Sequence, residues 1–196
     1  PRIALFGDCF TMYLESGIGS AAKRVFERLG YEVVLADAGC CARTMISTGL
    51  LEDAIATIDR TIEKLNTFAA DDSVHAILVV EPSCLSAIKG DWLQLKLAAP
   101  LRARRAIAAK CFLPEQFFSS ALTQHPDQAS IARAKGRAAS ETTTVILHGH
   151  CHQKALWGAE SSAAALRAFA GSRVRILDSG CCGMAGSFGF AEGHYD

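Results

Sequence analysis

Apolar residues in the first ninety positions follow two alternating spacings. Short, mostly apolar runs at 3–6, 32–36 and 74–80 have the length and β-branched content of buried strands. Between these runs, apolar positions recur every three or four residues within 21–29 and 51–65, which is the spacing of one helix face. Strand, helix, strand, helix, strand is the order of a parallel sheet covered by helices, so the pattern predicts an α/β fold.

The same pattern returns near the end of the chain. IALFGDC at 3–9 matches VILHGHC at 145–151, and GYEVVLADAGCC at 30–41 matches GSRVRILDSGCC at 171–182. Such a repeat predicts two pseudo-symmetric βαβ-type halves with short parallel sheets and cysteines at the carboxyl ends of the strands. We expect a first repeat, a helical or irregular connection, and a second repeat truncated at its C-terminus, at residues 1–89, 90–143 and 144–196.

The repeat also predicts what the second half lacks. The counterpart of Cys84 would fall beyond Asp196, so we expect the second half to miss a helix and a strand and to invite self-association into a homo-oligomer. The chain opens at Pro1, directly before a strand-like run and without an initiator methionine. We therefore expect it to be a piece of a longer protein, whose targeting signal cannot be judged here.

Composition narrows the class of protein. Half of the 196 residues are hydrophobic, which is enough for a substantial buried core. The formal net charge is zero, with 20 basic and 20 acidic residues, so we expect no nucleic-acid partner. The longest apolar runs, such as 76–80, are far shorter than the roughly 20 residues of a membrane helix, so we expect no transmembrane segment.

Cysteine placement carries the strongest chemical signal. Seven of the eight cysteines end or closely follow strand-like runs: Cys9, Cys40, Cys41, Cys84, Cys151, Cys181 and Cys182. The carboxyl ends of parallel strands meet at one edge of a sheet, and thiolates are the preferred ligands of iron–sulfur clusters and zinc. The pattern thus predicts a metal or cluster site in a reducing, cytoplasmic setting, which could include the inner face of the membrane. Cys111, alone in an expected helix, is predicted to be a buried apolar residue.

Three histidines surround Cys151 in the second repeat. Imidazole binds zinc and iron, and we single out His150 and His152 as candidate metal ligands because they bracket the cysteine, with His148 nearby. The remaining histidines have no such neighbours. They are expected at the surface or at helix ends, at positions His75, His125 and His194.

The twice-repeated order of strand, Cys, helix, strand, Cys-Cys-Gly resembles the cysteine-rich CCG domain. This family occurs in heterodisulfide reductase subunits and in iron–sulfur subunits of glycolate, lactate and anaerobic glycerol-3-phosphate dehydrogenases. HGHCHQKALWG at 148–158 and DSGCCGMAGSFGF at 178–190 are most similar to the C-terminal iron–sulfur region of FAD-linked D-2-hydroxyacid dehydrogenases of the D-2-hydroxyglutarate type.

The resemblance implies electron transfer. An iron–sulfur cluster, or zinc in its place, would be held by the strand-end cysteines and would relay electrons from FAD to an acceptor. The FAD would belong to an upstream domain, with flavin and ferredoxin-like domains as partners. No catalytic residue is expected in this chain, so the isolated chain should be inactive toward 2-hydroxyacids.

Two departures from the family pattern bear on the kind of site. Glu81 stands where the first cysteine of a terminal C-x-x-C would be, and Ala42 replaces the glycine after the first cysteine pair. Four cysteines suit a cubane cluster or a zinc ion better than a five-thiolate non-cubane cluster. The alternatives are a zinc-stabilised interaction module and a thiol–disulfide or quinone-reducing site like that of heterodisulfide reductase.

Overall fold

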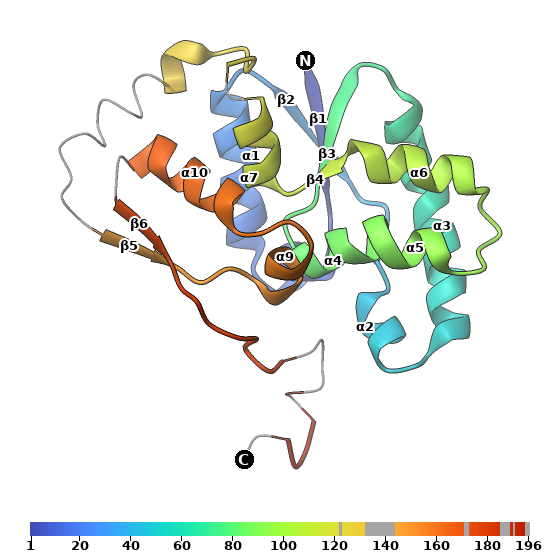
Figure 1. Cartoon of the computed structure of the whole chain (residues 1–196). Helices are drawn as coiled ribbons and strands as arrows, with labels where there is room; N and C mark the ends of the chain where they lie inside the picture. The colour runs from blue at the N-terminus through green and yellow to red at the C-terminus, as the bar shows by residue number, and fades with distance from the viewer. Residues whose placement is uncertain (122, 132–143, 171–172, 185–188, 190, 195–196) are drawn as a thin grey trace.

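The computed structural model contains two parallel sheets flanked by helices (Figure 1). It describes residues 1–121, 123–131, 144–170, 173–184, 189 and 191–194. The larger sheet has four strands in the order β2-β1-β3-β4, and the smaller has two, β5 and β6. The predicted α/β fold with short parallel sheets is confirmed.

The larger sheet is built mainly by the first half of the chain. Its strands are β1 (Arg2–Phe6), β2 (Glu32–Ala36), β3 (Val74–Leu78) and β4 (Cys111–Phe112). β1 pairs in parallel with both β2 and β3, so it lies inside the sheet, and most residues of β1 and β3 are buried. Near-continuous burial is expected for inner strands of a parallel sheet, because helices cover both faces.

Figure 1 shows α1, α7 and α10 on one side of this sheet and α3, α5 and α6 on the other. Phe26 of α1 (Ser16–Arg28) packs with Phe117 of α7 (Pro114–Ser120). On the opposite face, α3 (Leu51–Ala70) buries the later part of the apolar stripe predicted for it, Ile58, Ile62 and Leu65, whereas Leu51 is exposed. Trp92 of α5 (Trp92–Gln94) and Ile107 of α6 (Leu101–Lys110) join the same cluster.

Short helices follow the strands at the cysteine-bearing edge. The π-helical turn η1 (Phe10–Leu14) comes after β1, and α2 (Arg43–Ser47) comes after β2. After β3, the chain forms α4 (Pro82–Ser86) and the π-helical turn η2 (Ala87–Asp91). Pro82 at the first position of α4 ends the extended backbone and begins the helix, as its missing N–H and fixed φ favour.

The connection between the repeats contributes a strand to the first sheet. Cys111 and Phe112 form β4, whose partners in β3 are Ile77 and Leu78. Cys111 is completely buried, as predicted, but it lies in a strand and not in a helix. The expectation failed because two residues between a helix and a proline-started helix carry no periodicity of their own, and their strand geometry comes from pairing with β3.

The second half repeats the first through its second strand. β5 (Thr144–Leu147) is followed by α9 (Cys151–Leu156), α10 (Glu160–Ala170) and β6 (Arg173–Ile176), and β5 pairs with β6 in parallel. This succession matches β1, η1, α1 and β2. Residues of β5 and β6 alternate between exposed and half-buried, so this small sheet is much less covered than the large one.

His125 corrects one expectation from the sequence. It is buried, its Nδ1 lies 3.0 Å from the hydroxyl of Tyr31, and its Nε2 lies 2.9 Å from the carbonyl oxygen of Phe118. Aromatic rings of Phe117 and Phe118 also contact it. The expectation of a surface position for His125 was wrong, because neighbouring side chains enclose its imidazole and its two ring nitrogens have hydrogen-bond partners.

Among the helices that the structure describes, none is long and apolar enough to cross a membrane.

Candidate functional site

The four cysteines of the first half lie just beyond the carboxyl ends of three neighbouring strands. Cys9 follows β1, Cys40 and Cys41 follow β2, and Cys84 lies in α4 after β3. The Sγ atoms of Cys9 and Cys40 are 3.6 Å apart, and those of Cys41 and Cys84 are 2.7 Å apart. The four sulfurs therefore form an outer pair, Cys9 with Cys40, and an inner pair, Cys41 with Cys84, and each pair joins two different strand ends.

The backbone around Cys40 and Cys41 is held by local and distant hydrogen bonds. The N–H of Ala42 donates to the sulfur of Cys40 at 3.3 Å, and Ala42 takes a left-handed conformation with φ of 59°. Thr61 donates its hydroxyl to the carbonyl of Cys40, and Trp92 donates its indole N–H to the carbonyl of Cys41, both at 3.0 Å. The left-handed position explains why the family pattern has glycine there.

Exposure differs between the two pairs. Cys9 is exposed and Cys40 is half-buried, whereas Cys41 and Cys84 are 4% and 6% exposed. Burial raises the pKa of the Cys9 thiol to about 11, and the hydrogen bond with Cys41 raises the pKa of Cys40. The outer thiols are thus protonated at neutral pH, and binding of a metal would have to release their protons.

Asp8 belongs to this site although sequence reasoning overlooked it. The residue is fully buried, and its Oδ1 accepts hydrogen bonds from the N–H groups of Phe10 and Thr11 at 2.9 and 3.0 Å. Its Oδ2 is buried without a hydrogen-bond partner among the described residues, and burial raises the pKa of the carboxyl. A buried carboxylate oxygen with a free lone pair beside cysteine sulfurs fits a neighbouring cation or an ordered water.

The repeat contains the signal that would have identified Asp8. When IALFGDC is aligned with VILHGHC, Asp8 takes the position of His150. Both side chains accept backbone N–H groups at the start of the helical segment that follows: Asp8 accepts from Phe10 and Thr11, and His150 accepts from His152 at 3.2 Å. The two halves therefore use a different polar residue for the same local purpose.

His150 and His152 join the second half to the first. The Nε2 of His150 lies 3.5 Å from a carboxylate oxygen of Glu81, and the Nδ1 of His152 lies 2.7 Å from the hydroxyl of Ser86. Glu81 caps α4 and Ser86 ends it, so both histidines sit against the helix that carries Cys84, as α9 beside α4 in Figure 1 also shows. Burial lowers the pKa of His152.

The second cysteine pair repeats the local geometry of the first. The N–H of Gly183 donates to the sulfur of Cys181 at 3.4 Å, and the φ of Gly183 is 84°, again in the left-handed region. Cys181 and Cys182 are exposed. The hydrogen bond from Gly183, followed by that with the Cys151 thiol, lowers the pKa of Cys181. Cys151 lies 4.0 Å from Nδ1 of His150, and His148 approaches the carbonyl of Gly180 at 3.5 Å.

The four sulfurs are the kind of ligand that zinc and iron–sulfur clusters prefer. Their spacing agrees with that of a tetrahedral metal site for the outer pair but not for the inner pair. In a tetrahedral site with bonds of about 2.3 Å, sulfurs are about 3.8 Å apart, which is near the spacing of the outer pair but wider than that of the inner pair. Among the described residues, no three His, Cys, Asp or Glu side chains are already arranged around a point where a metal ion could sit. Ligation by the seven cysteines, His150 and His152 stays a prediction.

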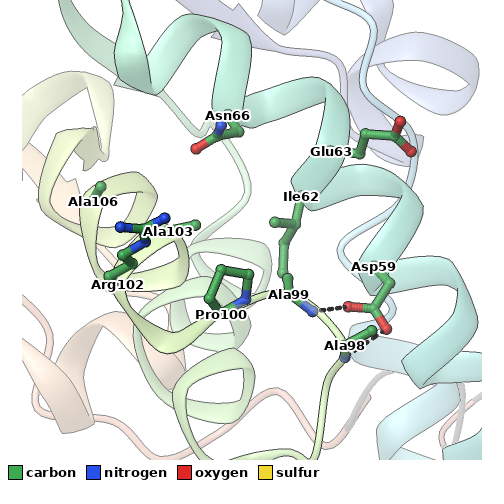
Figure 2. Close-up of a pocket in the computed structure, with 10 residues that line it drawn as sticks. All are labelled: Asp59, Ile62, Glu63, Asn66, Ala98, Ala99, Pro100, Arg102, Ala103 and Ala106. Carbon is green, nitrogen blue, oxygen red and sulfur yellow. Dashed lines mark hydrogen bonds between the residues drawn. The ribbon is translucent and has the colours of Figure 1, made fainter.

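A groove of about 660 Å³ lies elsewhere, between α3 and the start of α6 (Figure 2). Asp59, Glu63 and Arg102 are among its lining residues, and no cysteine is. Both carboxylate oxygens of Asp59 accept backbone N–H groups, from Ala98 and Ala99 at 3.0 Å. This carboxylate therefore fixes the loop before α6 and is not free for a ligand.

The fold and the strand-end sulfurs define a cysteine-rich α/β domain. Residues 3–89 match the family model of the CCG cysteine-rich domain, so the predicted family is confirmed for this segment. The equivalent cysteines of the second half lie outside the matched residues.

Relatives extend over almost the whole chain. One subunit of the anaerobic glycerol-3-phosphate dehydrogenase from Escherichia coli is 21% identical over 195 residues, which are 99% of this chain and 46% of that protein. Lactate utilization protein A from Bacillus cytotoxicus is 28% identical over 95% of this chain and 74% of its own length. D-2-hydroxyglutarate dehydrogenase from Escherichia coli is 27% identical over 93% of this chain but 16% of its own length.

Two of these three relatives are a dehydrogenase or a dehydrogenase subunit. The chain spans about half the length of the glycerol-3-phosphate dehydrogenase relative and a much smaller part of D-2-hydroxyglutarate dehydrogenase. No solved structure matches it significantly.

Proposed function

We propose that this chain is the iron–sulfur-binding, electron-transferring part of an oxidoreductase of the FAD-linked 2-hydroxyacid dehydrogenase type. The observation that carries the proposal is the meeting of Cys9, Cys40, Cys41 and Cys84 from three strand ends at one edge of the sheet. Thiolates in such a position are suited to a cluster. The relatives named above support an oxidoreductase setting.

The residues of the chain would have distinct tasks. The outer and inner cysteine pairs would hold the cluster, which supplies one-electron transfer when bound. Burial of Cys41 and Cys84 keeps water from one side of the site, and the free Oδ2 of Asp8 offers a hydrogen-bond acceptor to an ordered water. Cys151, Cys181 and Cys182, with His150 and His152, would form the corresponding set in the second half.

The source of electrons would be a flavin. In this proposal, FAD in a partner domain oxidises the 2-hydroxyacid, and electrons pass through ferredoxin-like clusters and this domain to an acceptor in the cytoplasm. The 196-residue chain alone is expected to leave D-2-hydroxyglutarate and D-lactate unreacted with an artificial acceptor, because the cofactor carries the hydride step.

The test is anaerobic reconstitution of the chain with iron and sulfide, followed by metal analysis and visible absorption spectroscopy. We expect a charge-transfer band that dithionite bleaches, and Cys84→Ala should lose most of it. Cys111→Ala is the matched control, because it removes an equally buried thiol that is far from the strand ends in sequence and lies in β4. This control should keep the band.

Other results would point away from the proposal. Tight zinc binding with no iron-dependent absorption would favour a zinc-stabilised interaction module. Equal loss of the band in Cys84→Ala and Cys111→Ala would mean that the cluster depends on folding and not on the strand-end cysteines.

A further inference from the structure

The sulfurs of the first half are arranged as two contacts and not as one evenly spaced group. The outer sulfurs are 3.6 Å apart and the inner sulfurs 2.7 Å apart, although their residues are separated by 31 and 43 positions in sequence. All four thiols are free. The sulfurs of each pair are therefore already in contact, which is the first requirement for a bond between them.

The observed contacts select one of the possible pairings of these four cysteines. Four cysteines allow three pairings. Linking Cys40 to Cys41 is disfavoured, because adjacent Cα atoms are about 3.8 Å apart and disulfides usually need about 4.4 Å or more. Of the two remaining pairings, only one joins the sulfurs that are in contact.

We propose that the metal-free chain is a modification site for hydrogen peroxide, which converts its first-half cysteines into two disulfides, Cys9–Cys40 and Cys41–Cys84. This inference goes beyond the proposed function, because neither disulfide requires a cluster or a partner domain. The oxidised form ties the ends of β1, β2 and β3 together and withholds all four sulfurs from a metal. A thiol reductant returns them.

Each disulfide forms in two balanced steps. A cysteine sulfur attacks one peroxide oxygen, the O–O bond breaks, and the products are a cysteine sulfenic acid and water. The partner thiol then attacks the sulfenic sulfur, which releases its oxygen as a second water. Two thiols have lost two electrons and two protons, and one peroxide has become two waters.

Exposure sets the order of the two disulfides. Cys9 is exposed and reaches peroxide directly, whereas both inner cysteines are almost fully covered. The outer disulfide therefore forms first. The inner one follows more slowly, because peroxide must reach sulfurs that only small molecules can approach.

Trypsin leaves Cys40 and Cys41 in one peptide, residues 29–43, so peptide masses alone do not tell their disulfides apart. Two variants, each lacking one of these cysteines, separate the two pairs. In metal-free Cys41→Ala treated with hydrogen peroxide, non-reducing mass spectrometry should join residues 3–23, which carry Cys9, to residues 29–43. In Cys40→Ala, residues 65–89, which carry Cys84, should be joined to residues 29–43 instead, and Cys9 should stay unpaired. Wild-type protein should give both links, and its four first-half cysteines should lose their alkylatable thiols in two phases.

The results also separate this inference from the proposed function. Joining of Cys9 to Cys41 in Cys40→Ala, or no protein disulfide in folded wild-type chain while Cys9 oxidises, would overturn the pairing. If either variant fails to fold, fragmentation of the linked wild-type peptides between Cys40 and Cys41 in the mass spectrometer assigns each link and keeps the test decisive. Because no metal is present, the proposed cluster could fail while the disulfides form, or the reverse.

Discussion

Ala42 and Gly183 follow equivalent cysteine pairs and share the same turn of the backbone. Their φ angles are 59° and 84°, and each N–H donates to the sulfur of the first cysteine of its pair. Glycine adopts this region freely, whereas an L-residue such as alanine loses about 1–2 kcal/mol there. Ala42 is thus a strained residue at the centre of the candidate site.

Ala42→Gly is expected to raise the free energy of unfolding by up to about 1 kcal/mol, because relief of left-handed strain exceeds the added flexibility of glycine in the unfolded chain. Urea denaturation measures the change. Ala38→Gly is the matched control: Ala38 is also buried, but it has no positive φ, so the same change should lower stability. Equal losses in both variants would show that the strain at Ala42 is negligible.

Cys181 is expected to be alkylated fastest of the eight cysteines in the metal-free chain. It is exposed, and the N–H of Gly183 lowers its pKa, so more of it is thiolate at neutral pH. Timed iodoacetamide labelling with peptide mass spectrometry should give a rate at least about tenfold above that of Cys111, which is completely buried and whose pKa burial raises to about 12. Faster labelling of Cys9 would contradict the prediction.

At the scale of elements, α4 and α9 connect the two cysteine sets. Cys84 lies within α4, and Cys151 begins α9. The contacts of His152 with Ser86 and of His150 with Glu81 hold the two helices together. Glu81 stands where the family pattern has a cysteine. Here its carboxylate lies beside His150 and so links the two halves of the chain.

Ser86→Ala should lower the free energy of unfolding by about 1–2 kcal/mol, because it removes a buried hydroxyl that bonds both the carbonyl of Ser83 and His152. Ser47→Ala, at an exposed position of α2, is the control and should change stability by no more than about 0.5 kcal/mol. Both values come from urea denaturation. A Ser86 effect as small as that of Ser47 would mean that α9 is held by other contacts.

The whole molecule has a well-covered sheet and a sparsely covered one. β1 and β3 are inner strands of the large sheet with mostly buried residues, whereas every residue of β5 and β6 is exposed or half-buried. Elements with fewer buried apolar contacts open at lower free energy. Amide hydrogen exchange is therefore expected to be slowest in β1 and β3 and faster in β5 and β6. Similar protection in both sheets would show that they unfold as one unit.

Much of this architecture could be predicted from the sequence because it depends on local periodicity. Apolar runs located β1, β2 and β3, and the stripe from Leu51 to Leu65 located α3, since each pattern is repeated over many residues. β4 could not be found in this way. Its two residues are extended only because β3 offers them partners.

The sequence by itself determined that cysteines follow the strands, and a parallel sheet then had to gather them at one edge. Which sulfur meets which was decided only in the tertiary structure, as were the burial of His125 and the placing of His150 and His152 against Glu81 and Ser86. Periodicity describes which face of an element is buried, but it holds no information on which distant side chains meet there. Those contacts are set by the packing of helices that lie far apart in the chain.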